Sequence, residues 1–144
     1  MDNTRPINIL LADDDPDDRF FFNKALKEIP LSTKLTTVHD GEELMNYLRR
    51  NLENLPNILF LDLNMPRKTG FECLFEIKDD EKLKSIPVVM FSTSFPSNLN
   101  YEQSMVETLK GIGAQNYIRK PGVFALLKEA ISNALTKEIE KIAK

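Results

Sequence analysis

The sequence predicts an α/β protein in which helices cover both faces of a doubly wound parallel sheet. Two observations carry this prediction. Five short apolar, β-branched runs alternate with five segments of helical spacing, and the length of 144 residues allows one domain with a single sizeable core. Repeated strand–helix alternation is typical of parallel sheets, because each crossover helix returns the chain to the edge at which the next strand begins. Right-handed crossovers limit the topologies to a few.

The predicted strands are short runs rich in Ile, Leu, Val and Thr, and each stops at or just before a polar residue. They are residues 7–12, 34–38, 57–62, 88–92 and 115–119. Nearly continuous apolar runs of this length are typical of strands that are buried on both faces.

Apolar residues recur at helical spacing between these strands and after the last one. The predicted inner faces are Phe21, Ala25, Leu26 and Ile29 in the first helix; Leu44, Tyr47 and Leu48 in the second; Phe71, Leu74 and Phe75, with Ile77 at the edge, in the third; Met105, Leu109 and Ile112 in the fourth; and Phe124, Leu127, Ile131 and Leu135 in the fifth. Because the three phenylalanines at 20–22 cannot all face inward, we expect Phe20 to be exposed. The last pattern continues, so we expect a final helix that extends to residue 142; a self-association seam on this extension is the alternative.

The first helix has a clear start. Residues 15–18 read Asp-Pro-Asp-Asp, with Asp15 suited to the N-cap, Pro16 to the first helical position, and the two acids that follow to the positive end of the helix dipole. This interpretation leaves Asp13 and Asp14 unexplained, because they still belong to the end of the preceding strand.

Composition narrows the class of protein. The net charge of −3 is spread along the chain, so neither nucleic acid nor an anionic membrane is an expected partner. No apolar run is long enough to span a membrane or to form a signal peptide. The single cysteine, Cys73, excludes an internal disulfide and fits a reducing compartment, so we expect a cytoplasmic location.

Side chains suited to phosphoryl chemistry lie at the ends of four predicted strands: Asp13 and Asp14, Asp62, Ser92 and Lys120. The carboxyl ends of parallel strands meet at one edge, where such proteins bind ligands. Three close carboxylates repel one another unless a cation lies between them, and Mg²⁺ prefers carboxylate and phosphate oxygens. We therefore expect a magnesium site that holds a phosphoryl group, with the lysine neutralising its charge and the hydroxyl donating a hydrogen bond.

Asp62 is the predicted nucleophile, since a carboxylate can attack phosphorus to form an aspartyl phosphate. It follows the buried run 58–61, which would fix its position. The segment from Asn64 to Gly70 contains Pro66 and has the composition of a tight loop, so we expect a backbone carbonyl near Asn64 to face the metal.

Four motifs in this order resemble the receiver domain of response regulators, the phosphoacceptor module of two-component signalling. They are LLADDD, LFLDLNMP followed by TG, VVMFSTS and NYIRKP, and the resemblance covers residue 7 to about residue 134. It implies a (βα)5 flavodoxin-like fold with strand order 2-1-3-4-5. It also implies a single receiver domain over residues 1–144.

The resemblance also implies roles for individual residues. Asp13 and Asp14 would be the acidic pair of the Mg²⁺ site, with Asp14 the more direct ligand. Asp62 would be both the phosphorylated residue and a metal ligand, and the main-chain oxygen of Asn64 would complete the protein's share of ligands. The side chain of Asn64 and that of Ser94 would tune hydrolysis of the acyl phosphate.

Further implied roles concern the response to phosphorylation. Ser92 would be the switch hydroxyl that closes on the phosphoryl group, and Lys120 would pair with that group. Lys120–Pro121 would be a cis peptide. Tyr117 occupies the position of an aromatic side chain that changes rotamer.

A protein of this class signals rather than catalyses turnover. It would accept its phosphoryl group from a sensor histidine kinase or a histidine phosphotransfer protein and act on a downstream protein target. The segment between Ser92 and Lys120 is longer than usual, with the extra length in SFPSNLNYEQ, and is similar to that of stand-alone receivers that serve phytochrome-type kinases.

Two alternatives remain open at this point. A degenerate receiver would use the same fold as a phosphate-independent interaction module and would show no magnesium affinity. A phosphatase with an aspartate nucleophile would want a second carboxylate two residues after Asp62, where this chain has Asn64. A nucleotide-binding fold is disfavoured because no glycine-rich loop follows the first strand, and the chain is too short to add a DNA-binding domain.

Overall fold

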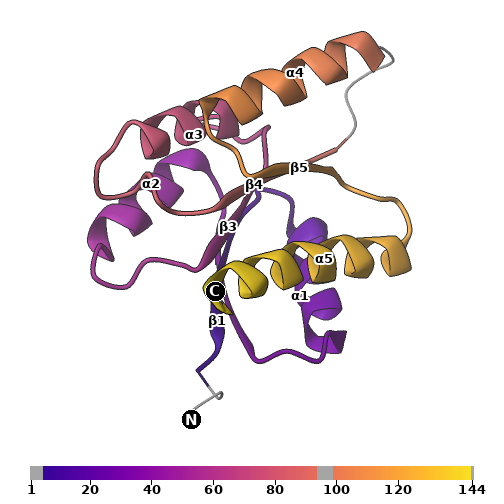
Figure 1. Ribbon diagram of the computed structural model, residues 1–144. Coiled ribbons are helices and arrows are strands. Elements are labelled where there is room, and N and C mark those ends of the chain that lie inside the picture. Colours follow the sequence, from indigo (N-terminus) through magenta and orange to yellow (C-terminus); the bar gives the residue numbers. More distant parts are fainter. Residues whose placement is uncertain (1–4, 94–98, 144) are drawn as a thin grey trace.

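The computed structural model describes residues 5–93 and 99–143. Its centre is a five-stranded parallel sheet with the strand order β2-β1-β3-β4-β5. Helices α1 and α5 cover one face of the sheet, and α2, α3 and α4 cover the other (Figure 1). The predicted fold class and strand order are therefore confirmed.

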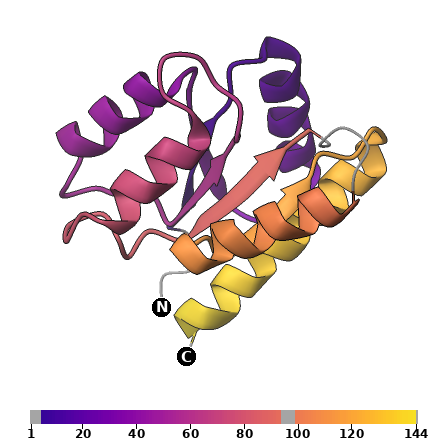
Figure 2. The ribbon, with the colours of Figure 1, turned by 90° about the horizontal axis from the view of Figure 1, so that it is seen from above.

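Strands and helices alternate along the whole described chain. The elements are β1 (Ile7–Ala12), α1 (Pro16–Glu28), β2 (Thr33–Val38), α2 (Gly41–Arg50), β3 (Ile58–Leu61), α3 (Gly70–Lys78), β4 (Val88–Ser92), α4 (Leu99–Ile112), β5 (Asn116–Arg119) and α5 (Phe124–Ala143). The strand ends differ from the predicted ones by one residue at most. On the face covered by three helices, α3 lies between α2 and α4, and α4 lies towards the β5 edge of the sheet (Figure 2).

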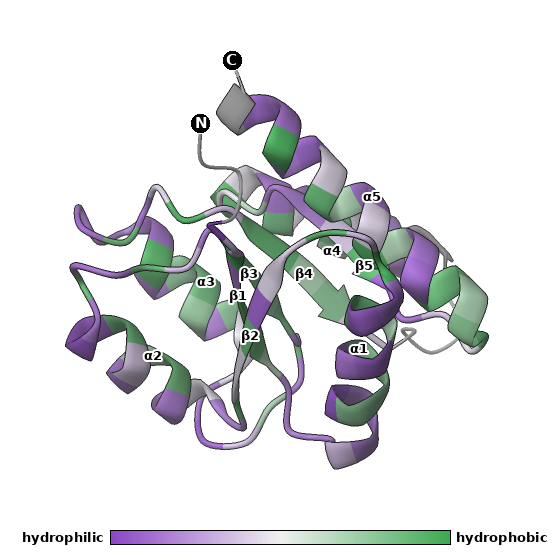
Figure 3. Ribbon diagram, turned by 90° about the horizontal axis from the view of Figure 1, so that it is seen from below, coloured by the Kyte–Doolittle hydropathy of each residue, from purple (hydrophilic) through white to green (hydrophobic). Residues whose placement is uncertain are grey.

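Two apolar cores lie on the two faces of the sheet, and the central strands contribute to both. Residues 58–61 are fully buried and alternate between the cores, so β3 is held firmly from both sides. The green central strands and the purple outer surfaces of the helices show this layering (Figure 3). Among the described residues, no helix is long and apolar enough to cross a membrane.

The predicted inner face of α1 is wrong by one residue at its second turn. Phe22, not Phe21, is buried, and its ring makes edge-to-face contacts with Phe60 at 5.0 Å and Phe91 at 5.8 Å between centroids. Phe21 is 44% exposed, and Phe20 is exposed as predicted. Phe22 precedes Ala25 by three residues, which continues the buried stripe of the helix.

The predicted face of α3 is wrong in part: Leu74 and Ile77 are buried as predicted, but the two phenylalanines are not. Phe71 and Phe75 are exposed, whereas Cys73, Leu74 and Ile77 are buried. The sequence GFECLFEIK is apolar on nearly all sides, so spacing alone could not select a face. We attribute the choice to Gly70, because this residue lies against the backbone of Asp62 and Leu63, just after β3, where a side chain would not fit.

Gly70 packs against the main chain that carries Asp62. A Cβ at this position would lie 2.1 Å from the carbonyl oxygen of Asp62, so alanine requires the backbone to move. We predict that Gly70→Ala lowers the free energy of unfolding by about 2 kcal/mol, as overpacking does. Gly111→Ala is the matched control, because Gly111 lies in α4 with nothing within 4 Å of an added Cβ.

The control should stabilise the protein by about 0.5–1 kcal/mol, since alanine favours a helix more than glycine does. Urea unfolding of both variants measures the two effects. A Gly70→Ala protein as stable as the wild type, or stabilised like the control, would show that the contact with Asp62 tolerates a side chain.

Candidate functional site

The acidic residues of the predicted site come together at the carboxyl edge of the sheet. Ala12 and Leu61 are register partners in β1 and β3, so Asp13 and Asp62 leave adjacent strands side by side. Asp13 and Asp62 are buried, and Asp14 is exposed. One carboxylate oxygen from each of the three lies within 4.8 Å of the others.

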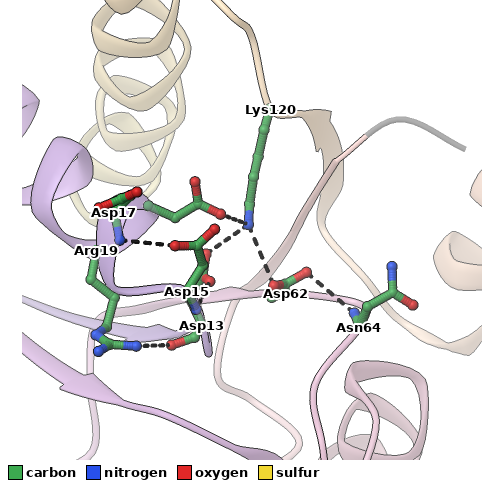
Figure 4. A network of polar contacts seen from close by, with 8 residues as sticks. Asp13, Asp15, Asp17, Arg19, Asp62, Asn64 and Lys120 are labelled. Carbon is green, nitrogen blue, oxygen red and sulfur yellow. Dashed lines mark hydrogen bonds and ion pairs between the residues drawn. The ribbon is translucent and has the colours of Figure 1, made fainter.

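The loop after β1 holds Asp13 through its neighbours. The backbone N–H of Asp15 donates to Oδ1 of Asp13 at 3.0 Å, and the Arg19 guanidinium donates to the carbonyl oxygen of Asp13 at 2.8 Å (Figure 4). Asp15 also caps α1, because its carboxylate accepts from the backbone N–H of Asp17 at 2.9 Å, and Pro16 begins the helix as predicted. The capped helix thus fixes the strand end.

Asp62 lies in a restrained and electrostatically strained position. Its Oδ1 accepts from the backbone N–H of Asn64 at 3.2 Å, and its Oδ2 lies 3.4 Å from Nζ of Lys120. Burial raises the pKa of Asp62 to about 6; the Lys120 charge opposes this shift and the Asp13 charge adds to it. The pKa of Asp13 is raised as well, again chiefly by burial, although its hydrogen bond with Lys120 opposes the shift.

Lys120 reaches the acids from the loop after β5. Its ammonium donates to Asp13 at 2.7 Å, to Asp18 at 2.8 Å and to Asp62 at 3.4 Å, and its side chain is only 9% exposed. Burial alone would lower the pKa of Lys120, but the hydrogen bonds with Asp13 and Asp18 outweigh it and raise this pKa above its ordinary value. The lysine therefore stays charged at neutral pH.

Two residues at this site were not predicted. Sequence reasoning treated Asp18 only as a helix-start acid and did not single out Arg19. Both lie at the start of α1, and their spacing after β1 does not by itself show which residues of the site they contact.

Ser92 has an unusual environment at the end of β4. Its hydroxyl is buried and has no hydrogen-bond partner among the described residues. The backbone N–H of Lys120 donates to the carbonyl oxygen of Ser92 at 2.7 Å, so the hydroxyl-bearing residue and the lysine lie on adjoining strand ends. An unpaired buried hydroxyl costs stability and marks a position that is poised to gain a partner.

Tyr117 links β5 to α4. Its hydroxyl donates to Glu102 at 3.2 Å, and its ring packs against the core beneath α4. Burial, followed by the nearby Glu102 charge, raises the pKa of Tyr117 to about 12. Residues 94–98, which include Ser94 and the first half of the lengthened segment SFPSNLNYEQ, lie outside the described residues. The expectation that the whole segment precedes the fourth helix is wrong, because α4 begins at Leu99 and so contains residues 99–103.

One prediction about the loop after β5 is wrong, namely the cis peptide bond between Lys120 and Pro121. No cis peptide bond occurs among residues 5–93 and 99–143, so Lys120–Pro121 is trans. Trans is the lower-energy isomer even before proline. In this chain the lysine reaches its carboxylates from a trans backbone, so no cis bond is needed to direct it.

The donor set fits a hard divalent cation. The three carboxylates of Asp13, Asp14 and Asp62 offer only oxygen ligands within reach of a single ion. The pKa values of Asp13 and Asp62 are both raised chiefly by burial, and the nearby charge of Lys120 offsets this only in part. A bound cation would supply further positive charge beside both carboxylates.

The site and the fold define a family. The family model "Response regulator receiver domain" matches residues 9–132, and the chain belongs to this family. It is a receiver domain homologous to the response regulators of two-component systems, a family for which phosphorylation is expected, and its members bind divalent metal at this acidic pocket.

Particular relatives are found among both curated proteins and solved structures. Response regulator Rcp1 of Synechocystis sp. is 40% identical over 93 residues, 62% of this chain and 63% of Rcp1. Two-component response regulator ARR15 of Arabidopsis thaliana is 32% identical over 132 residues, 85% of this chain and 59% of ARR15. The chain therefore spans less than two thirds of the length of these curated relatives.

Two crystal structures are similar over most of their length. The phosphorylated cyanobacterial phytochrome response regulator RcpA superposes with a TM-score of 0.77 at 32% identity, covering 90% of this chain and 91% of RcpA. The Mn²⁺-bound form of Rcp1 gives a TM-score of 0.75 at 31% identity, covering 89% of this chain and 91% of Rcp1.

Proposed function

We propose that Asp62 is the phosphoacceptor of a single-domain response regulator in a two-component phosphorelay. The observation that carries this proposal is the juxtaposition of Asp62 with a second buried carboxylate and the charged Lys120. An oxygen of Asp62 attacks phosphorus, the bond from phosphorus to the donor's imidazole nitrogen breaks, and an acyl phosphate forms on the carboxylate.

The surrounding residues then have distinct roles. Asp13, Asp14, Asp62 and the main-chain oxygen of Asn64 would hold Mg²⁺, whose charge offsets that of the phosphoryl oxygens when it is bound. Lys120 donates to a phosphoryl oxygen and balances part of its charge.

The response to phosphorylation is proposed to pass through Ser92 and Tyr117. The unpaired hydroxyl of Ser92 gains a partner when phosphoryl oxygens arrive, and the Tyr117 ring then exchanges its contact with Glu102 for the space beside β4. The side chains of Asn64 and Ser94 are the proposed tuners of acyl-phosphate hydrolysis.

The proposed partners are a sensor histidine kinase, or a histidine phosphotransfer protein, and a downstream protein target in the cytoplasm. Similarity to RcpA, a phytochrome response regulator by its description, supports a phytochrome-type kinase as the phosphoryl donor. The proposed activity is signalling by protein contact, with turnover limited to self-phosphorylation and self-dephosphorylation.

Acetyl phosphate tests the function directly. We expect the purified protein to gain one phosphoryl group when it is incubated with acetyl phosphate and Mg²⁺, and peptide mapping to assign that group to Asp62. A protein that gains no phosphoryl group and shows no magnesium affinity would instead be a degenerate receiver. Steady hydrolysis of phosphate monoesters would favour the phosphatase alternative.

Ser92→Ala should separate phosphorylation from its response. We expect the variant to be labelled at Asp62 but to lose the change in the Tyr117 ring signals that acetyl phosphate produces in the wild type, as followed by NMR. Its free energy of unfolding should rise by about 1 kcal/mol, because a buried unpaired hydroxyl is removed. Thr93→Ala, at the next and exposed position, is the control and should change neither property.

A further inference from the structure

We propose that Asp18 is a positioning residue that draws the ammonium of Lys120 away from Asp62 and so slows phosphoryl capture, a role that rests on the function proposed above. Lys120 lies nearer to Asp18, at 2.8 Å, than to Asp62, at 3.4 Å. The contact between Asp18 and Lys120 joins the first turn of α1 to the loop after β5.

The number of donors on the lysine makes this a competition. An ammonium group has three N–H donors and accepts no hydrogen bond. In the protein the three donors of Lys120 face three carboxylates, those of Asp13, Asp18 and Asp62. A phosphoryl oxygen on Asp62 therefore gains a strong contact with the lysine only if one of the present acceptors gives it up.

Asp18 differs from the other two acceptors because it does not belong to the metal-binding cluster. That cluster consists of Asp13, Asp14 and Asp62. A cation there would offset the charges of Asp13 and Asp62 and weaken their hold on the lysine, whereas Asp18 would keep its full charge. The attraction of Lys120 to Asp18 thus persists in the loaded site.

The position of Asp18 is rigid enough for this role. It lies in the first turn of α1, whose start is fixed by the Asp15 cap and by Pro16. The Lys120 side chain is only 9% exposed, so water competes weakly for its ammonium, although the Asp18 side chain is 31% exposed. The two residues also line a pocket of about 290 Å³ between α1 and α5.

A matched pair of variants tests the proposal. Asp18→Asn keeps the size of the side chain and removes its charge, and Asp17→Asn removes the same charge from the same helical turn. Asp17 is exposed and its side chain makes no ion pair with any described residue, so it controls for net charge and helix dipole. Labelling from acetyl phosphate is measured at saturating Mg²⁺, so that a change in metal affinity does not enter the rate.

We expect Asp18→Asn to be labelled about fivefold faster than the wild type, and Asp17→Asn to stay within about twofold of it. Asp18→Glu restores the charge on a longer side chain and should return the rate towards that of the wild type. Equal rates for Asp18→Asn and Asp17→Asn, or slower labelling of Asp18→Asn, overturn the proposal.

A second readout does not depend on turnover. Beryllium fluoride with Mg²⁺ mimics an acyl phosphate, and its affinity, measured by titration, should rise in Asp18→Asn by a factor similar to that of the rate. Thermal unfolding checks that all variants fold. If the wild type is not labelled and does not bind beryllium fluoride, the proposed function fails together with this inference. If the wild type is labelled but Asp18→Asn and Asp17→Asn are labelled at equal rates, only the role of Asp18 is overturned.

Discussion

Asp62→Asn is expected to gain no phosphoryl group from acetyl phosphate and Mg²⁺ under conditions that fully label the wild type. The amide is a poor nucleophile, and the proposed function leaves Asp13 and Asp14 as metal ligands. Asp62 is held by the N–H of Asn64 and lies beside the charged Lys120, whereas Asp14 is exposed. Mass spectrometry of the intact protein measures the loss.

Asp79→Asn is the control for this prediction, because Asp79 is an exposed acid at the end of α3, away from the sheet edge that carries the site. It should be labelled like the wild type. Labelling of Asp62→Asn at the wild-type rate would show that the nucleophile is another residue, and peptide mapping would then identify it.

Magnesium is expected to stabilise the fold strongly at neutral pH and weakly at acid pH. The pKa of Asp62 is raised from 3.8 to about 6, so between these two pH values the folded protein holds a proton that the unfolded chain has lost. Without metal, this carboxyl stabilises the fold fully below about pH 4, and its contribution is lost as pH rises through about 6. The loss is of the order of 3 kcal/mol.

Metal binding should have the opposite pH dependence, with a stabilising effect that grows as pH rises. A cation binds the ionised carboxylates, so its affinity should rise as Asp62 and Asp13 lose their protons. At a concentration about 100-fold above its Kd, Mg²⁺ should add about 2.7 kcal/mol to the free energy of unfolding at about pH 7.5 and much less at about pH 5. Urea unfolding with Mg²⁺ or with a chelator measures both values.

Asp62→Asn serves here as a second test. Without metal it should be more stable than the wild type at about pH 7.5, because a neutral amide replaces a carboxylate whose ionised form is disfavoured by burial, and Mg²⁺ should stabilise it less. A magnesium effect that is equal at both pH values, or that survives unchanged in the variant, would argue against a cation at these carboxylates.

The sequence was sufficient to predict the residues at the strand ends, and the reason is geometric. A parallel sheet brings its carboxyl ends to one edge, so locating the end of each apolar run was enough to bring Asp13, Asp62 and Lys120 together. The contact between Asp18 and Lys120 could not be found in this way. It depends on how α1 leaves β1 relative to the loop after β5, and local spacing does not contain that orientation.

Helix rotation was the other property that spacing left open. In α3 the apolar residues surround the helix, and we attribute the choice of the buried side to the small size of Gly70 against the carbonyl oxygen of Asp62. In α1, three successive phenylalanines made neighbouring stripes nearly equivalent. Phe22 was selected by rings that lie far away in the sequence, Phe60 and Phe91.

The unpaired hydroxyl of Ser92 has a consequence for the evolution of this chain. A site that keeps two neighbouring carboxylates out of water, and one buried hydroxyl with no partner in the part of the chain that the structure describes, lowers the stability of the fold. A library selected only for survival at high temperature should therefore accumulate alanine at position 92 and neutral residues at position 62. It should retain Gly70, whose replacement brings no such gain.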